Sequence, residues 1–303
     1  MLNNIAVIGA GTMGNGIAHL FAQFGFKVAL VDLSKEKLAK SIITINKNFD
    51  RQVSKGILSP EDKEVALKNI TTFTEINTGV GSAELVVEAA TENTELKLSI
   101  FKMLDEAAPE GCILATNTSS ISITRIAAIT KRPSDVIGMH FMNPVPIMKL
   151  VEVINGYNTS PEVTSSILSI CKKLQKIACE VNDYPGFIAN RILMPMLNEA
   201  MYALYEGVAG LEEIDTIMKL GMSHPMGPLE LADFIGLDTC HAIMKVLQEG
   251  LGNTKYAPCP LLSNMVMAGK LGVKSGEGFY VYTAEGKVLP QSHKGTKRHK
   301  GIS

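Results

Sequence analysis

The apolar positions in the first half of the chain follow two alternating patterns. Short runs rich in apolar residues predict buried strands at residues 2–8, 28–31, 84–90, 112–116, 136–141, 150–154 and 179–181. Between these runs, apolar residues recur every three or four positions, as at Ile17, Leu20, Phe21 and Phe24, which predicts amphipathic helices. Strands that alternate with helices are typical of a mostly parallel, doubly wound α/β sheet.

The pattern changes at Pro185-Gly186, a dipeptide that signals a turn. After it, helical spacing dominates at residues 187–206, 211–220 and 229–248. We therefore expect three parts. They are an α/β domain over residues 1–184, an all-helical C-terminal domain over 185–283, and a flexible basic tail over 284–303.

Composition narrows the class of protein. A chain of 303 residues with 46% hydrophobic and 19% charged residues can bury two domain cores. Lys plus Arg total 29 and Asp plus Glu total 30, which argues against a general attraction to nucleic acid or membrane. The five cysteines form no C-x-x-C pair, so we expect no disulfide framework, no metal site and a reducing compartment. With no apolar run of about 18 residues and no basic leader, the prediction is a cytoplasmic enzyme or binding protein.

A glycine-rich segment lies between the first strand and the first helix. It reads Gly9-Ala10-Gly11-Thr12-Met13-Gly14. In this context the three glycines serve a tight turn, a close approach of the backbone to a pyrophosphate, and tight packing of helix on strand. Asp32 ends the second strand about 20 residues later, where a carboxylate binds ribose hydroxyls and favours NAD (NADH) over NADP. Lys35 would weaken that preference; FAD binding and a purely structural turn are the alternatives.

The late strands carry the candidate acid–base pair. His140 ends one apolar strand, and Glu152 lies inside the next apolar run, where a carboxylate is costly to bury without a partner. The short Pro-containing connection would bring these two strands together. An ionised Glu152 would then favour the imidazolium form of His140 and fix its tautomer, which suits a general base for an alcohol that loses a hydride to NAD. A structural role for a histidine at a strand end is the alternative reading.

Two polar segments are further candidates. Residues 116–120 follow another strand and are rich in hydrogen-bonding groups, although Ser and Asn also serve as helix caps. Asn190 and Arg191 begin a helix just after Pro185-Gly186, and Asn190 would reach a cleft between the domains. A surface or capping role for these two residues is equally open.

Collinear motifs extend these features along the chain. They are residues 7–14, 117–120, 140–144, 149–153, 185–187, 190–191, 224–228 and 276–280. Together they make the chain resemble the short-chain L-3-hydroxyacyl-CoA dehydrogenases, most closely the bacterial 3-hydroxybutyryl-CoA dehydrogenases. The resemblance covers nearly everything up to Tyr282. Met142 departs from the family pattern, in which a second Phe is common.

The resemblance implies a Rossmann-type domain, a helical substrate domain that forms a homodimer contact, and a set of site residues. His140 would be the base, Glu152 its partner, and Ser119 and Asn190 would complete the substrate site. Further contacts to the cofactor would come from Ser119, Asn143, Glu92, Lys97 and Lys274. Contacts to the acyl-CoA substrate would come from Lys55, near Lys47, and from Asn48, where the family can have Ser.

The activity implied is the reversible oxidation of (S)-3-hydroxybutyryl-CoA to acetoacetyl-CoA with NAD, in fatty acid or butyrate metabolism. Two alternatives are a related hydroxyacid dehydrogenase and a non-enzymatic, crystallin-like NADH-binding protein. The related hydroxyacid dehydrogenases use a catalytic Lys in their helical part, whereas this chain carries His140 and Glu152. The crystallin-like reading is disfavoured by the intact set of His140, Glu152, Ser119 and Asn190.

Overall fold

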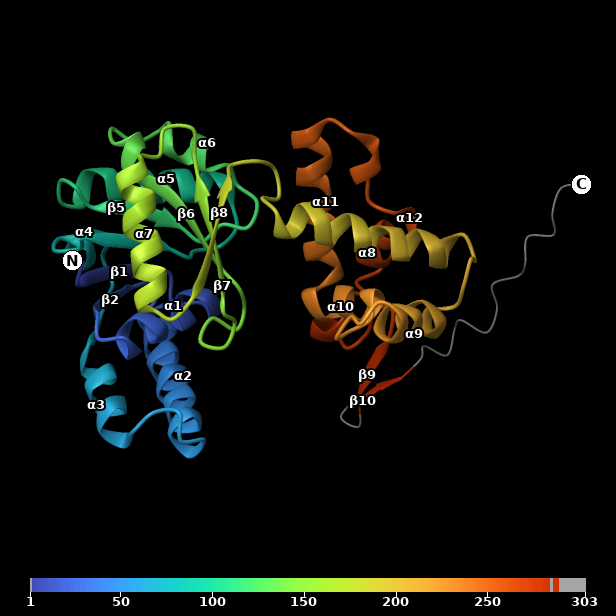
Figure 1. Ribbon diagram of the computed structural model, residues 1–303, viewed down its shortest axis with the longest axis horizontal. Coiled ribbons are helices and arrows are strands. Elements are labelled where there is room, and N and C mark those ends of the chain that lie inside the picture. Colours follow the sequence, from blue (N-terminus) through green and yellow to red (C-terminus); the bar gives the residue numbers. More distant parts are fainter. Residues whose placement is uncertain (1, 284–285, 289–303) are drawn as a thin grey trace, which may run out of the picture. The chain divides into compact units, whose positions relative to one another are not determined.

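The computed structural model describes residues 2–283 and 286–288 and divides into two compact units (Figure 1). The first unit ends at Phe187 and the second begins at Ile188, three residues beyond the boundary expected from the sequence. Within the described residues, no helix has the length and apolar character needed to cross a membrane. All five cysteines are free thiols, and only Cys179 is exposed.

An eight-stranded sheet forms the centre of the first unit. Its order is β3-β2-β1-β4-β5-β6-β7-β8, and every neighbouring pair is parallel except β6 and β7. The strands are β1 (Asn4–Ile8), β2 (Lys27–Val31), β3 (Ile70–Phe73), β4 (Leu85–Glu88), β5 (Ile113–Thr116), β6 (Val136–Phe141), β7 (Leu150–Asn155) and β8 (Ile177–Asn182). The predicted mostly parallel sheet is confirmed.

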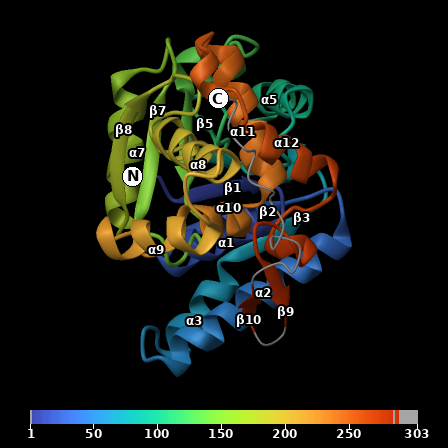
Figure 2. The same ribbon diagram turned by 90° about the vertical axis from the view of Figure 1, so that its right-hand side faces the viewer.

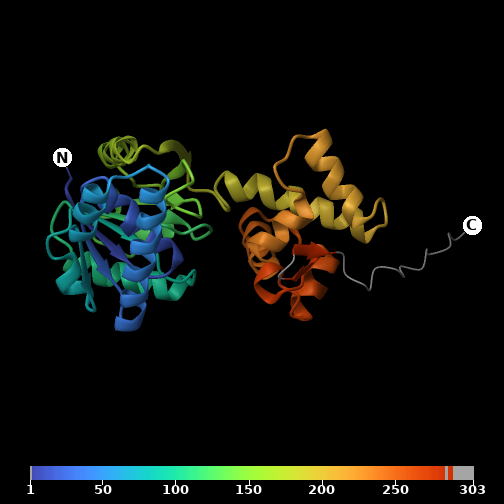
Figure 3. The same cartoon turned by 90° about the horizontal axis from the view of Figure 1, so that it is seen from below.

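Helices cover both faces of this sheet (Figures 2 and 3). They are α1 (Thr12–Gln23), α2 (Lys35–Ser54), α3 (Pro60–Lys68), α4 (Ile76–Val80), α5 (Thr94–Ala107), α6 (Ile123–Ala127) and α7 (Pro161–Lys173), with a short 3-10 turn η1 (Pro133–Asp135). In β1, Ile5 and Val7 belong to one apolar core, while Ala6 and Ile8 belong to a second core on the opposite face. Because successive side chains of a strand point to opposite faces, this split explains the continuous apolar run in a doubly wound sheet.

The second unit is mainly helical. Its elements are α8 (Ala189–Tyr205), α9 (Leu211–Gly221), α10 (Pro228–Ile235), α11 (Leu237–Leu251), η2 (Thr254–Tyr256), α12 (Pro260–Met267), η3 (Val273–Ser275), β9 (Val281–Thr283) and β10 (Gly286–Val288). The single helix expected over residues 229–248 is wrong, because it is two helices that meet at Gly236. The φ angle of Gly236 is 103°, a left-handed value that an α-helix does not contain.

Three residues of the expected flexible tail have a defined structure. Gly286–Val288 pairs antiparallel with Val281–Thr283. Lys287 forms an ion pair with Glu230, and its ammonium lies 4.5 Å from the ring centroid of Tyr280. These contacts correct the expectation for this short segment. The rest of the expected tail, residues 284–285 and 289–303, lies outside the described residues.

Candidate active site

The glycine-rich turn joins β1 to α1, and its three glycines meet different surroundings. Gly9 has φ 101°, and a Cβ there would lie 2.8 Å from the carbonyl oxygen of Ala89. A Cβ on Gly14 would lie 1.8 Å from the carbonyl oxygen of Gly9, whereas a Cβ on Gly11 would meet nothing within 4 Å. The turn is therefore packed tightly against the sheet but open at Gly11, the position at which a pyrophosphate would approach the N-terminus of α1.

Asp32 fixes the other side of this turn. One carboxylate oxygen accepts a hydrogen bond from the backbone N–H of Ala10 at 2.9 Å, and the other accepts from the N–H of Ser34 at 3.0 Å. Gly9, Gly11 and Asp32 line the same pocket, with a volume of about 630 Å³. The pocket lies at the carboxyl ends of β1 and β2, where open α/β sheets bind their ligands. Its size and its open glycine fit a dinucleotide.

His140 and Glu152 face each other across the only antiparallel pair in the described sheet. They are register partners on β6 and β7, and His140 Nδ1 lies 2.8 Å from Glu152 Oε2. The side chains are only 12% and 4% exposed, so this contact is largely shielded from water. An ionised carboxylate can only accept hydrogen bonds. With Glu152 ionised, the Nδ1–H of His140 donates to it, which leaves Nε2 as the basic nitrogen of the neutral ring.

Glu92 holds the segment that contains Ser119. Its Oε1 accepts hydrogen bonds from the Thr118 hydroxyl at 2.6 Å and from the backbone N–H groups of Ser119 and Ser120 at 2.9 and 3.2 Å. The Ser119 hydroxyl lies 3.3 Å from the same oxygen. Burial raises the pKa of Glu92, but the charge of Lys97 and these hydrogen bonds outweigh it and hold the pKa below its usual value. Glu92 is therefore an anion at neutral pH.

Lys97 is buried and takes part in an ion pair that sequence reasoning missed. Its ammonium lies 2.8 and 2.9 Å from the two carboxylate oxygens of Glu88 and 3.5 Å from Glu92 Oε2. Glu88 is fully buried and also accepts a hydrogen bond from the Thr116 hydroxyl at 2.7 Å. The sequence does contain a signal for this ion pair, because Glu88, like Glu152, is a carboxylate inside an apolar strand and needs a buried partner. Lys97 is only 1% exposed, so its ammonium acts mainly on Glu88 and Glu92.

The remaining predicted residues fall into three places. Asn143 and Asn48 line one pocket of about 350 Å³ that also includes Gly11. Lys55 is exposed at the C-terminal cap of α2 and does not line this pocket. Asn190 and Lys274 belong to the second unit. Asn190 is buried in α8, and Lys274 in η3 forms an ion pair with Asp238. Their roles at the site of the first unit stay predictions.

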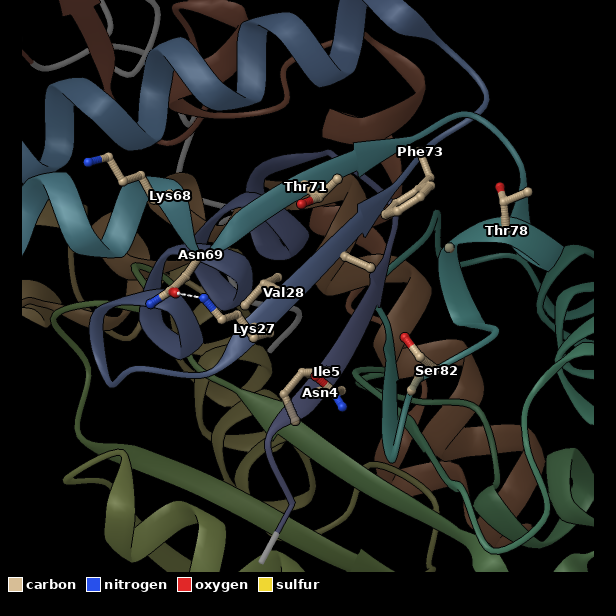
Figure 4. Close-up of a pocket in the computed structure, with 13 residues that line it drawn as sticks. Asn4, Ile5, Lys27, Val28, Lys68, Asn69, Thr71, Phe73, Thr78 and Ser82 are labelled. Carbon is tan, nitrogen blue, oxygen red and sulfur yellow. Dashed lines mark hydrogen bonds between the residues drawn. The ribbon is translucent and has the colours of Figure 1, made fainter.

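A separate pocket of about 290 Å³ lies at the amino ends of β1 and β2 (Figure 4). The ammonium of Lys27 bonds to Asn69 Oδ1 at 2.7 Å, and Lys68 points away from this bond. The cationic groups do not converge on one point. This pocket is also at the opposite strand ends from the glycine turn, so it is not part of the candidate site.

Comparison with known proteins places the chain in a family. Residues 4–184 match the model of the 3-hydroxyacyl-CoA dehydrogenase NAD binding domain, and residues 186–282 match that of the 3-hydroxyacyl-CoA dehydrogenase C-terminal domain. The chain belongs to the 3-hydroxyacyl-CoA dehydrogenase family, whose members are oxidoreductases that act on a CH–OH group, and its first unit contains an NAD-binding domain.

Several relatives resemble it over almost their whole length. It is 52% identical to the probable 3-hydroxybutyryl-CoA dehydrogenase of Bacillus subtilis over 284 residues, which is 93% of this chain and 98% of that protein. It is 51% identical to the 3-hydroxybutyryl-CoA dehydrogenase of Bradyrhizobium diazoefficiens, over 93% and 96% of the two chains. The crystal structure of (S)-3-hydroxybutyryl-CoA dehydrogenase from Ralstonia eutropha matches with a TM-score of 0.91 and 47% identity, over 93% and 100% of the chains.

Proposed function

We propose that the protein interconverts (S)-3-hydroxybutyryl-CoA and acetoacetyl-CoA with NAD, through a general acid–base pair of His140 and Glu152. One observation carries this proposal. The 2.8 Å contact between His140 Nδ1 and Glu152 Oε2 occurs near the carboxyl end of β6, which runs parallel to β1 through β4 and β5. The imidazole and the glycine turn therefore belong to the same edge of the sheet. The names of the relatives above support the substrate.

The residues of this chain would move one proton in each direction. When bound, NAD accepts the hydride that leaves C3 of the hydroxyacyl substrate. Nε2 of His140 takes the proton of the 3-hydroxyl group, and Glu152 stabilises the imidazolium through the Nδ1–H bond. In the reverse direction, the imidazolium returns this proton to the 3-oxo group.

Other residues would bind and orient the reactants. We assign Ser119 and Asn190 to the 3-oxygen of the substrate or to the orientation of the imidazole. The dinucleotide would be held by residues 9–14, Asp32, Glu92, Ser119, Asn143 and Lys274. The buried Lys97 would contribute to this site through its contact with Glu92. The coenzyme A part would contact Asn48 and Lys55. The pocket that Asn48 shares with Gly11 supports a substrate path beside the cofactor.

The domains would divide this work. Residues 1–184 would bind NAD, and residues 185–283 would complete the substrate site and form a homodimer contact. A cytoplasmic enzyme of fatty acid or butyrate metabolism fits this assignment.

The direct test is a turnover assay with purified protein, in which the reaction is monitored through the absorbance of NADH. We expect oxidation of NADH with acetoacetyl-CoA and little with free acetoacetate, because the coenzyme A part supplies binding energy. Comparable rates with free acetoacetate would favour a hydroxyacid dehydrogenase. NADH binding without turnover of either compound would overturn the proposal.

A further inference from the structure

Strand β6 extends beyond β5 at the end that carries His140. The paired residues of β5 and β6 stop at Thr116, which lies opposite Gly138. On the other side, pairing with β7 continues to Phe141, which lies opposite Val151. The last three residues of β6, numbers 139–141, thus lie beyond the last pair with β5. His140 is the middle one of these three.

The side chain of Asn117 continues the contact where β5 stops. Its Oδ1 accepts a hydrogen bond from the backbone N–H of Phe141 at 2.8 Å. Its own backbone N–H donates to the carbonyl oxygen of Glu88 on β4 at 2.7 Å. Asn117 therefore ties the end of β6 to β4, and it does so at the residue that directly follows His140. Asn117 also opens the segment that contains Ser119.

We propose that Asn117 is a positioning residue for the imidazole of His140, an inference that rests on the proposed function. Glu152 holds the ring from the β7 side through Nδ1. Asn117 holds the backbone beside the ring from the β5 side, and it fixes the base relative to the Ser119 segment. Proton transfer needs the reacting atoms within hydrogen-bond distance, and a misplacement of about 1 Å can cost about 100-fold in rate.

The variant Asn117→Ala removes the acceptor for the Phe141 N–H. We expect kcat for reduction of acetoacetyl-CoA to fall by about 10- to 100-fold, while KM for NADH changes by less than about twofold. Thermal unfolding and NADH binding of the variant report whether the fold and the cofactor site are intact. An unchanged kcat would overturn the proposal. So would a loss confined to the KM for NADH.

A double-mutant cycle separates positioning from a general structural effect. If Asn117 acts through the imidazole, Asn117→Ala should change the residual rate of the His140→Ala variant by less than about twofold, because residues that act as a unit are not additive. Equal fold losses in the wild-type and His140→Ala backgrounds would overturn the proposal. They would mean that Asn117 acts on substrate or cofactor without the imidazole.

NMR tests the inference independently of the substrate. In Asn117→Ala, we expect faster hydrogen exchange at the Phe141 amide and shifted ring resonances of His140. In Asn117→Asp, which keeps an acceptor oxygen, the Phe141 amide should stay protected. Ring resonances of His140 that do not move in Asn117→Ala would overturn the positioning role, even if the Phe141 amide exchanges faster. If the wild-type protein does not turn over acetoacetyl-CoA, but Asn117→Ala still shows these NMR changes, only the proposed substrate is overturned. The positioning role of Asn117 then stands.

Discussion

Glu152 lies directly opposite His140 across an antiparallel strand pair, and an oxygen of its buried carboxylate lies 2.8 Å from Nδ1 of the imidazole. Directly opposite residues of such a pair point to the same face of the sheet, with their Cβ atoms about 5 Å apart. The register of β6 and β7 therefore sets the geometry of the His140–Glu152 pair. A shift of one residue would turn Glu152 to the other face.

Replacing Glu152 by Gln tests whether the carboxylate acts on the imidazole. The amide keeps the size of the side chain but cannot stabilise an imidazolium by charge, so we expect kcat at neutral pH to fall by about tenfold or more. The exposed Glu180 on β8 offers a matched control, and Glu180→Gln should leave kcat unchanged. Steady-state kinetics with acetoacetyl-CoA measure both. Equal kcat values for wild type and Glu152→Gln would refute the proposed action of Glu152 on the imidazole of His140.

We expect the choice between NADH and NADPH to depend on the charge of Asp32. Asp32→Asn keeps a carbonyl oxygen that can accept one of the two backbone N–H bonds, but it removes the charge that repels a 2′-phosphate. We expect the preference for NADH over NADPH to narrow by about tenfold or more, a shift of about 1.4 kcal/mol in relative binding.

The ratio of kcat/KM values for NADH and NADPH measures this change. Glu75 lines the same pocket, and Glu75→Gln is the control for a general loss of negative charge. If the preference for NADH over NADPH narrows equally in both variants, no single carboxylate recognises the ribose. An unaltered ratio in Asp32→Asn would assign that role to another residue.

The sheet was predictable because its signals are local. An apolar run followed by Gly9 and an amphipathic helix predicts one β–α unit, and repeating that pattern predicts the fold. The strand Ile70–Phe73 was missed because Thr71 and Thr72 are polar, and this edge strand leaves them exposed. The break at Gly236 was missed because apolar spacing continues across it. A single glycine in a helical pattern does not reveal its φ angle.

The site was predictable only in part, for a different physical reason. A carboxylate in an apolar strand implies a buried partner, and this argument paired Glu152 with His140 across a short connection. The partner of Glu88 is Lys97, on a helix that starts after the strand, and its identity depends on tertiary packing. The bond from Phe141 to Asn117 depends on where β5 stops relative to β6. No local pattern encodes such an offset between strand ends.

The buried pair of Glu88 and Lys97 should matter for stability as well as for the site. Lys97→Met leaves the Glu88 carboxylate buried without its cation, which typically costs about 3–5 kcal/mol of unfolding free energy. The double variant with Glu88→Gln and Lys97→Met removes both charges and should recover part of this loss. Guanidinium unfolding of the full chain measures the unfolding free energy of the first unit in both variants. A double variant that is less stable than Lys97→Met alone would contradict the pairing.

A buried histidine outside the site should make the protein sensitive to acid. His19 on α1 is fully buried and stacks on Phe49 of α2, with ring centroids 4.0 Å apart. Burial lowers the pKa of His19 from 6.5 to about 4, and contacts with the side chains of Gln23 and Gln52 offset this effect only in part. The neutral ring is the form that fits this site.

The sign of the pH effect follows from this lowered pKa. Below pH 6.5, His19 becomes protonated in the unfolded chain but stays neutral in the folded protein. The free energy of unfolding therefore decreases as the pH is lowered from 6.5 to about 4. The slope is about 1.4 kcal/mol per pH unit and the full loss about 3 kcal/mol. His19→Leu removes this titration. The variant should therefore gain stability relative to wild type as the pH is lowered.

Guanidinium unfolding of wild type and His19→Leu, at several pH values between about 7 and 4.5, measures this difference. Any change in packing caused by the leucine is independent of pH, and other titrating groups contribute equally to both proteins. Only His19 should make the difference between the two curves grow as the pH falls. A difference that stays constant over this range would show that the imidazole does not titrate differently in the folded and unfolded chains.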